Sequence, residues 1–346
     1  MKKYFNNFPE LASVVFSFII LSAFFVFINL IMPASSEEKW KEVNIPEGST
    51  YSNTITILKN EGIIGNRFAL LILGRVTTKD RQIKPGYYNL SASMTPLQVF
   101  DKLIKGKSIY FTITIPEGYA LEDIRLKLKD TGLINDQSWK IVYDRDFLKS
   151  LGINAPSLEG YLFPDTYNFA KGTEPTTIFK TMVQRLRESF DQTLIKRAAE
   201  IGMSENEVLT LASIIEKEAF FDAERPLISA VCHNRLKKNI KLQVDPTVVY
   251  GIRTYLQFIT KEDLKRKTPY NTYVINGLPP GPIASPGMKS IKAALYPAKV
   301  NYLYFVSKND GSHYFSRTNE EHSRAVMFYQ RNNENNSAQN VEEKVH

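Results

Sequence analysis

Residues 209–222, LTLASIIEKEAFFD, place a carboxylate, Glu218, in the middle of an apolar stretch that has helical periodicity. Ser204 and Glu207 have the spacing of a capping box, which predicts where the helix begins, and Pro226 forbids its continuation. The apolar residues between these limits recur at helical spacing: Val208, Leu211, Ile215 and Ala219. The sequence therefore predicts a buried helix that carries an acidic group.

Glu216 and Glu218 are two residues apart, which turns their side chains roughly 200° from each other on a helix. A single cleft therefore cannot receive both. Glu218 lies over Ile214 and Leu211 on the apolar stripe, whereas Glu216 does not. Burial disfavours the charged form of a carboxyl group, so we expect Glu218 to have a raised pKa and to be able to act as a general acid.

A structural role for Glu218 is the alternative. In that case its carboxylate is paired with Arg225 or Arg235, or it reaches solvent.

Residues 11–32, LASVVFSFIILSAFFVFINLIM, contain no charge, and 22 residues in a helix span roughly 33 Å, enough to cross a bilayer. Lys2 and Lys3 precede this segment and acidic residues follow it. The positive-inside rule therefore predicts a single-pass membrane protein with residues 1–10 in the cytoplasm and everything after Pro33 outside it. A cleaved signal peptide is the alternative, but 22 apolar residues exceed an ordinary signal core.

The chain has 346 residues, of which 43% are hydrophobic, so it can bury a large core and we expect two domains. Its single cysteine, Cys232, excludes an intrachain disulfide. The net charge is +8, but the basic residues are scattered among acidic ones, so we expect no nucleic-acid partner. The histidines lie far apart, which predicts no metal site, and we expect no cofactor.

An internal repeat organises the first half of the chain. Residues 45–64 align with residues 115–134 at an offset of 70, and both contain IPEG followed by an amphipathic stretch and a glycine. Each copy predicts a strand, a tight turn and a helix. A long helix is expected over 175–202, further helices over 226–239 and 287–295, and a strand over 302–307. The fold class is therefore α+β.

Several motifs resemble the MltG-type (YceG-like) endolytic murein transglycosylases, and the resemblance covers residues 40–330. They are EGYLFPDTY, LASIIEKEA, LQVDPTVVYG, YNTY, GLPPGPIASPG, YPAKVNYLYFV and the pair Glu321–His322. The resemblance implies a LysM-like module over 40–110 and a transglycosylase catalytic domain over 111–330, anchored in the inner membrane and located in the periplasm. The tail over 331–346 is polar and has no periodicity, which predicts disorder. It also implies peptidoglycan glycan strands as substrate, limitation of nascent strand length, and peptidoglycan synthases as partners.

The family reaction cleaves the bond between N-acetylmuramic acid (MurNAc) and N-acetylglucosamine (GlcNAc) and leaves a 1,6-anhydro end. The resemblance assigns the catalytic glutamate to Glu218, the residue that helix geometry also selects. Ala219 stands where other transglycosylases often have a helper serine, so other residues must orient the substrate. The candidates are polar groups that can bond sugars: Gln243, Asp245, Tyr270, Asn271 and Tyr273.

Two other functions stay open. A muramidase would hydrolyse the same bond and would need a second carboxylate, for which Glu159 and Asp165 are candidates. A non-catalytic peptidoglycan-binding membrane protein would need neither. His313 and His322 are further candidates to reach the site, and the loop over 277–287 forms either a wall of the cleft or a connector.

Overall fold

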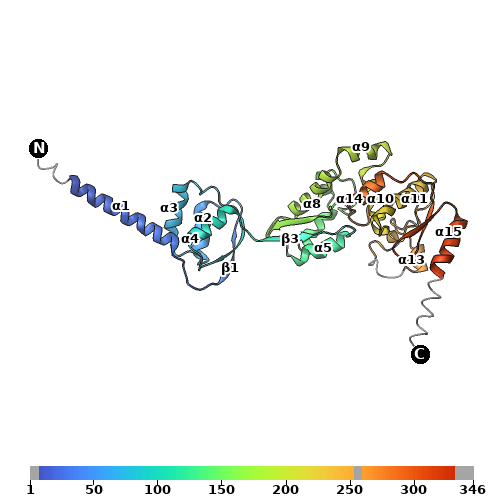
Figure 1. Cartoon of the computed structure of the whole chain (residues 1–346). Coiled ribbons are helices and arrows are strands. Elements are labelled where there is room, and N and C mark those ends of the chain that lie inside the picture. The colour runs from blue at the N-terminus through green and yellow to red at the C-terminus, as the bar shows by residue number, and fades with distance from the viewer. Residues whose placement is uncertain (1–7, 253–258, 332–346) are drawn as a thin grey trace, which may run out of the picture. The chain divides into compact units, whose positions relative to one another are not determined.

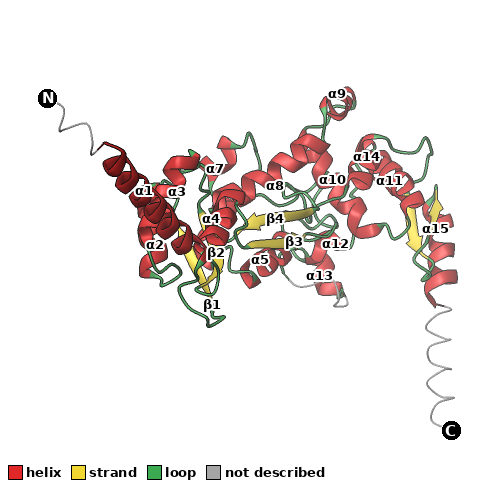
Figure 2. Ribbon diagram, turned by 60° about the vertical axis from the view of Figure 1, so that its left-hand side comes forward, coloured by secondary structure: helices red, strands yellow, loops and turns green. Residues whose placement is uncertain are grey.

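The computed structural model describes residues 8–252 and 259–331 (Figure 1). The chain divides into two compact units. The first comprises Met1–Thr112 and Asn168–Thr173, and the second comprises Ile113–Tyr167 and Glu174–His346. Helices and two-stranded sheets occur in one chain (Figure 2), which confirms a mixed α+β fold. The predicted tail lies almost entirely outside the described residues.

The first unit begins with α1 (Phe8–Ile31), an apolar helix. Its Leu11–Ile31 portion is long and apolar enough to span a membrane, and none of it is buried. This helix fits a single-pass anchor; the orientation of the chain across the membrane stays a prediction.

A small module follows α1. It consists of β1 (Trp40–Ile45), α2 (Tyr51–Asn60), α3 (Arg67–Thr77), β2 (Gly86–Ser91) and α4 (Pro96–Lys105). Strands β1 and β2 pair antiparallel, with Trp40 opposite Ser91 and Ile45 opposite Gly86. The module has its own core, because side chains from both strands and from all three helices are buried together: Val43, Ile55, Leu70, Leu90, Val99 and Leu103.

The second unit contains most of the helices. Strands β3 (Tyr110–Thr114) and β4 (Thr166–Ala170) form one sheet whose residues are divided between the two units, and β5 (Tyr304–Ser307) pairs with β6 (His313–Ser316) within the second unit. The longer helices are α5 (Leu121–Asp130), α8 (Pro175–Ser189), α9 (Gln192–Glu200), α10 (Glu205–Glu218), α11 (Arg225–Lys237), α14 (Met288–Leu295) and α15 (Asn319–Val326). The short ones are α6 (Asp136–Trp139), α7 (Arg145–Ser150), α12 (Pro246–Val249) and α13 (Lys261–Lys265).

The internal repeat has the predicted local structure. In each copy a strand precedes the IPEG turn, and a helix follows it, α2 in the first copy and α5 in the second. Gly48 and Gly118 adopt positive φ in the two turns. By contrast, the single helix predicted over 175–202 is wrong, because Asp191 accepts bonds from the N–H groups of Thr193 and Leu194 and starts α9 as a separate helix.

Helix α10 is the centre of the second unit. Every residue from Val208 to Ile215 is buried, including Thr210 and Ser213. The hydroxyls of these two residues donate to main-chain carbonyls, Thr210 to that of Asn206 and Ser213 to that of Thr210, so their burial is compensated. The helix packs against α11 and α14 and therefore holds its last residue in a fixed position.

Candidate active site

Glu218 is the last residue of α10. The Ser204–Glu207 capping box starts this helix as predicted, but the helix ends at Glu218 rather than continuing to residue 222, because Ala219 is extended (φ −81°, ψ 117°). The carboxyl group therefore lies at the C-terminal end of a helix dipole, where negative charge is disfavoured. The end of the helix and the burial of the group therefore both favour the protonated form of the carboxyl.

A cleft of about 540 Å³ opens at Glu218. Its walls come from α10, α11, the 242–245 segment, β5, β6 and α15, all within the second unit. Most of the side chains that line it are polar or aromatic, among them Arg235, Gln243, Asp245, Tyr273, Tyr304, His313 and His322. Such a surface offers hydrogen bonds and flat apolar faces, which suits a carbohydrate.

The Glu218 carboxyl has the environment of an acid. Burial raises its pKa to about 8, and the nearby charge of Asp245 adds to this effect. Within the described residues no hydrogen bond or ion pair to this carboxyl is present. The arginines that could have paired with it are engaged elsewhere. Arg225 pairs with Glu216 and Asp222, and Arg235 donates to the carbonyls of Lys241, Leu242 and Leu303.

Three of the five predicted substrate-binding residues line the cleft: Gln243, Asp245 and Tyr273. The Tyr273 hydroxyl donates to Asp245 Oδ1 at 2.6 Å. Gln243 has a positive φ of 51° and accepts a bond from Arg235 Nη1 at 3.2 Å. A non-glycine residue in the left-handed region is strained, and such residues concentrate at functional sites.

The other two predicted binding residues lie elsewhere. Asn271 is fully buried, and its side-chain amide donates to the carbonyls of Asp263, Leu264 and Arg266. This amide holds a turn together, so the structure does not place Asn271 in the cleft as the sequence predicts. The Tyr270 ring packs against the Tyr250 ring with a centroid distance of 4.6 Å and an interplanar angle of 47°, and Tyr270 is not among the residues that line the cleft.

Glu159 does not face Glu218 across the cleft. It is 3% exposed, and both of its carboxylate oxygens lie 3.1 Å from the N–H of Leu121, the first residue of α5. Tyr250 donates to it at 2.9 Å. Burial raises the pKa of Glu159 to about 7, and these bonds oppose the shift. Glu159 therefore caps a helix.

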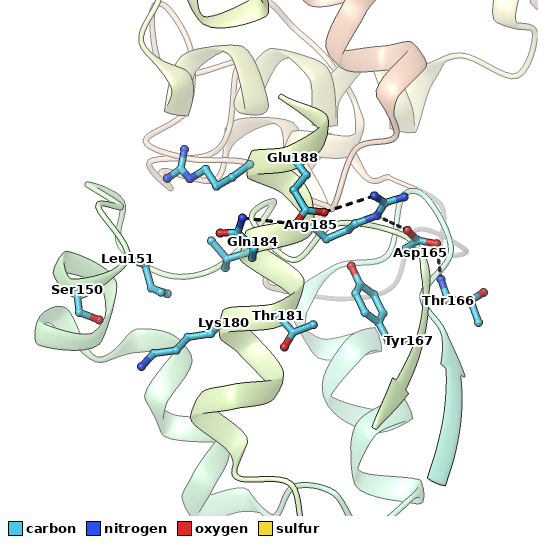
Figure 3. Close-up of a pocket in the computed structure, with 12 residues that line it drawn as sticks. Ser150, Leu151, Asp165, Thr166, Tyr167, Lys180, Thr181, Gln184, Arg185 and Glu188 are labelled. Carbon is cyan, nitrogen blue, oxygen red and sulfur yellow. Dashed lines mark hydrogen bonds and ion pairs between the residues drawn. The ribbon is translucent and has the colours of Figure 1, made fainter. Parts of the chain in front are cut away.

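Asp165 lies in a different pocket, which has a volume of about 740 Å³ (Figure 3). Arg185 donates to Asp165 at 2.5 Å, and this bond lowers the pKa of the carboxyl. A carboxylate held charged by an arginine cannot donate a proton near neutrality. This pocket is larger than the cleft at Glu218, but its acidic group is unsuited to acid catalysis.

One wall of the cleft consists of aromatic and basic side chains from β5, α11 and α15. The rings of His322 and Tyr304 stack with a centroid distance of 5.1 Å. The Arg235 guanidinium lies over the same Tyr304 ring, 4.9 Å from its centroid. His322 Nδ1 is buried without a hydrogen-bond partner among the described residues. Burial, and then the Arg235 charge, lower the pKa of His322, so the ring is neutral near pH 7. His313 also lines the cleft, with Nδ1 2.7 Å from Glu224.

Comparison with known proteins identifies the family. The model of the YceG-like family matches residues 43–327, which is most of the chain. The chain belongs to the YceG-like family. The endolytic murein transglycosylase of Bacillus subtilis (strain 168) is 35% identical over 332 residues, covering 90% of this chain and 91% of that protein. The endolytic murein transglycosylase of Streptococcus pneumoniae serotype 2 is 30% identical over 338 residues, covering 87% of this chain and 60% of that protein.

A solved structure agrees with this assignment. The crystal structure of a YceG-like protein from Listeria monocytogenes superposes with a TM-score of 0.57 at 35% identity, covering 84% of this chain and 100% of that one.

In this YceG-like chain the proline- and glycine-rich loop over 277–287 is hydrogen-bonded to side chains of α10. The N–H of Ile283 donates to Ser213 Oγ, and the N–H of Gly287 donates to Glu216 Oε2. A Cβ at Gly287 would lie 1.9 Å from a carboxylate oxygen of Glu117, so a larger residue there would require the exposed Glu117 side chain to move. None of the loop is among the residues that line the cleft, which favours the connector over the cleft wall.

We expect Glu216→Gln to lower the free energy of unfolding by about 2 kcal/mol, because it breaks a buried ion pair. The Glu216 and Arg225 side chains are 7% and 9% exposed, and Glu216 Oε1 lies 3.1 Å from Arg225 Nη1. The loss of stability is smaller than for a buried arginine without any acidic partner, because Arg225 keeps its ion pair with Asp222. Denaturant unfolding checks this. The matched control, Glu188→Gln on an exposed helix face, should change stability by less than about 0.5 kcal/mol; equal effects would contradict a structural role for Glu216.

Proposed function

We propose that this YceG-like chain is a peptidoglycan lytic transglycosylase that cleaves the MurNAc–GlcNAc bond within glycan strands. The single observation that carries the proposal is Glu218. Its carboxyl lies at a cleft with its pKa raised to about 8, and the described residues offer it no ion-pair partner. The relatives from B. subtilis and S. pneumoniae named endolytic murein transglycosylases support the same reaction.

The reaction needs one proton carrier. Glu218 is protonated near pH 7 and donates its proton to the glycosidic oxygen as the bond from that oxygen to the muramyl C1 breaks. The C6 hydroxyl of the same sugar then attacks C1, and the Glu218 carboxylate takes the proton that this hydroxyl releases. The ring closes to the 1,6-anhydro form and Glu218 regains its proton. Because the attacking hydroxyl is tethered to the sugar, proximity replaces a second catalytic carboxylate.

The other residues of the cleft orient the sugar in this proposal. Asp245 is held by Tyr273 and keeps Glu218 protonated through its negative charge. The side-chain amide oxygen of Gln243 accepts a bond from Arg235, and the strained backbone of Gln243 donates its N–H to the carbonyl of Thr272, so the amide has a fixed position. Neutral His322 offers a nitrogen that can accept a bond from a sugar hydroxyl.

A hydrolase is the second candidate, and the structure changes which residue it would use. Glu159 and Asp165 are engaged elsewhere, as a helix cap and in an ion pair. Among the described residues that line the cleft, Asp245 is the acidic group besides Glu218. A muramidase would therefore depend on Asp245 to activate water.

Asp245→Asn separates the two reactions. We expect the full-length chain to produce 1,6-anhydromuramyl ends from undigested murein, and Asp245→Asn to keep that product. The alkaline limb of the pH–rate profile should move to lower pH, since removing the Asp245 charge lowers the pKa of Glu218. Mass analysis of the digestion products checks both points. Reducing ends from the wild type, together with loss of all cleavage in Asp245→Asn, would establish a hydrolase instead.

The remaining assignments are proposals of the same kind. We place the catalytic domain over 111–330 and a LysM-like module over 40–110, tethered by α1 to the inner membrane with the module on the periplasmic side. Cysteine labelling of Glu47→Cys in intact and permeabilised cells tests that side, since Glu47 is exposed. The proposed partnership with peptidoglycan synthases rests on the family resemblance.

A further inference from the structure

Helix α3 exposes an apolar stripe. Phe68, Ile72 and Val76 follow one another at four-residue spacing, so they lie on one face of the helix, and they are 63%, 44% and 77% exposed. The other face of α3 carries Ala69 and Leu70, which are buried in the core of the module. One face of the helix therefore packs into the core of the module, and the other face leaves an apolar surface exposed.

This exposed stripe is continuous with the surface of α1. Ile72 lines an apolar groove together with α1 side chains from Phe18 to Leu30. Asn66, the N-cap of α3, donates through its side chain to Asn29 Oδ1 near the end of α1 at 3.1 Å. Both helices belong to the first unit, and Figure 1 shows α3 beside the end of α1.

The position of α3 along α1 determines the depth at which α3 would lie in a bilayer that α1 crosses. Its N-terminus lies at the level of Asn29, two residues before α1 ends at Ile31, and Ile72 lies against the C-terminal half of α1. If α1 crosses a bilayer, this level is the boundary between the acyl chains and the lipid headgroups. Apolar side chains exposed at that level meet lipid rather than water.

Basic residues flank the stripe. Arg67, Arg75, Lys79 and Arg81 are all exposed, and Asp80 is the single acidic residue between positions 67 and 81. An apolar face bordered by lysine and arginine is typical of helices that lie in a membrane interface, where the cations reach the phosphate groups of anionic lipids.

We propose that α3 is a second membrane contact, which lies in the interfacial layer of the bilayer that α1 crosses. Phe68, Ile72 and Val76 insert between lipids, and the surrounding arginines and lysine bind anionic headgroups. The small module is then fixed against the membrane by two helices instead of turning freely on one. This inference rests on α1 as a membrane span and is independent of the reaction at Glu218.

Fluorescent labels on single cysteines test the contact. The full chain is reconstituted in vesicles of zwitterionic and anionic phospholipids, and Cys232, which is 1% exposed, is replaced by serine. An environment-sensitive label is placed in turn at Phe68→Cys, Ile72→Cys and Val76→Cys. Lipids that carry a nitroxide near the headgroup should quench each label at least about twofold. The matched control is Glu47→Cys, an exposed position two residues after β1 ends at Ile45. The label at this position should not be quenched.

Two further measurements separate the possible outcomes. A label at Ile20→Cys within α1 must be quenched by lipids with a nitroxide deep in the acyl chain; if it is not, the anchor fails rather than the contact of α3. Replacing anionic by zwitterionic lipid should weaken quenching at α3 while leaving Ile20→Cys unchanged. Labels on α3 that behave like Glu47→Cys would overturn the proposal. So would labels that become shielded from water without nitroxide quenching, because a second copy of the chain would then cover the stripe.

Discussion

Glu218→Gln is expected to reduce the formation of 1,6-anhydromuramyl ends by about 10³-fold or more. General acid–base catalysis contributes typically 10²–10⁴-fold, and in the proposed mechanism one residue serves as both acid and base. Glutamine keeps the size of the side chain but cannot donate the proton to the leaving oxygen. The measurement is the rate of anhydro-end formation by the full chain on undigested murein.

The neighbouring glutamate on the same helix provides the control. Glu216→Gln removes a carboxylate two residues away, but that carboxylate bonds Arg225 and the N–H of Gly287 on the side of α10 away from the cleft. Its activity per folded molecule should therefore stay close to that of the wild type. The assignment of Glu218 fails if Glu218→Gln retains more than about a tenth of the wild-type rate, or if both variants lose activity to the same extent.

The local structure around the candidate site is predictable where the information is local. The capping box at Ser204 and the apolar spacing after it are short-range signals. They locate the start of α10, and the helical geometry they predict agrees with a cleft that is lined by Glu218 and not by Glu216. The two IPEG turns were equally readable, because their glycines require positive φ whatever the tertiary structure.

The differences from expectation come from backbone contacts that the sequence pattern does not reveal. Asn271 was expected to bind sugar because an amide can, but its partners are carbonyls of the 263–266 turn. Glu159 was a candidate second carboxylate, and the N-terminus of α5, 38 residues earlier, is what uses it. His322 and Tyr304 belong to segments that meet only in the fold. Polarity alone cannot distinguish a ligand-binding group from one that satisfies the backbone.

Glu218→Gln is also expected to stabilise the protein near pH 8, and the gain should vanish near pH 4.5. The pKa of Glu218 is about 8 in the folded chain and close to 4.5 when exposed. Below pH 4.5 both states hold the proton, so burial of this group costs little. Between pH 4.5 and 8 the unfolded state releases the proton and the folded state keeps it, so stability decreases as pH rises.

The size of this effect follows from the pKa difference. A shift of one unit corresponds to about 1.4 kcal/mol, which gives an upper limit of about 5 kcal/mol, and water in the open cleft reduces it to about 3 kcal/mol. Glutamine avoids this cost because it has no proton to lose. Thermal unfolding of the full chain in detergent, measured from pH 4.5 to 8.5, should therefore show the two curves diverging as pH rises.

The difference in stability between wild type and Glu218→Gln reports on Glu218 and not on other buried acidic residues. Glu159 also has a raised pKa, of about 7, and destabilises the chain in the same pH direction, but it is present in both proteins and cancels in the difference. Asp245→Asn should recover part of the same gain, since its charge contributes to the shift at Glu218. Parallel curves for wild type and Glu218→Gln would mean that this carboxyl is solvated and charged, and the proposed acid would then lack its proton at neutral pH.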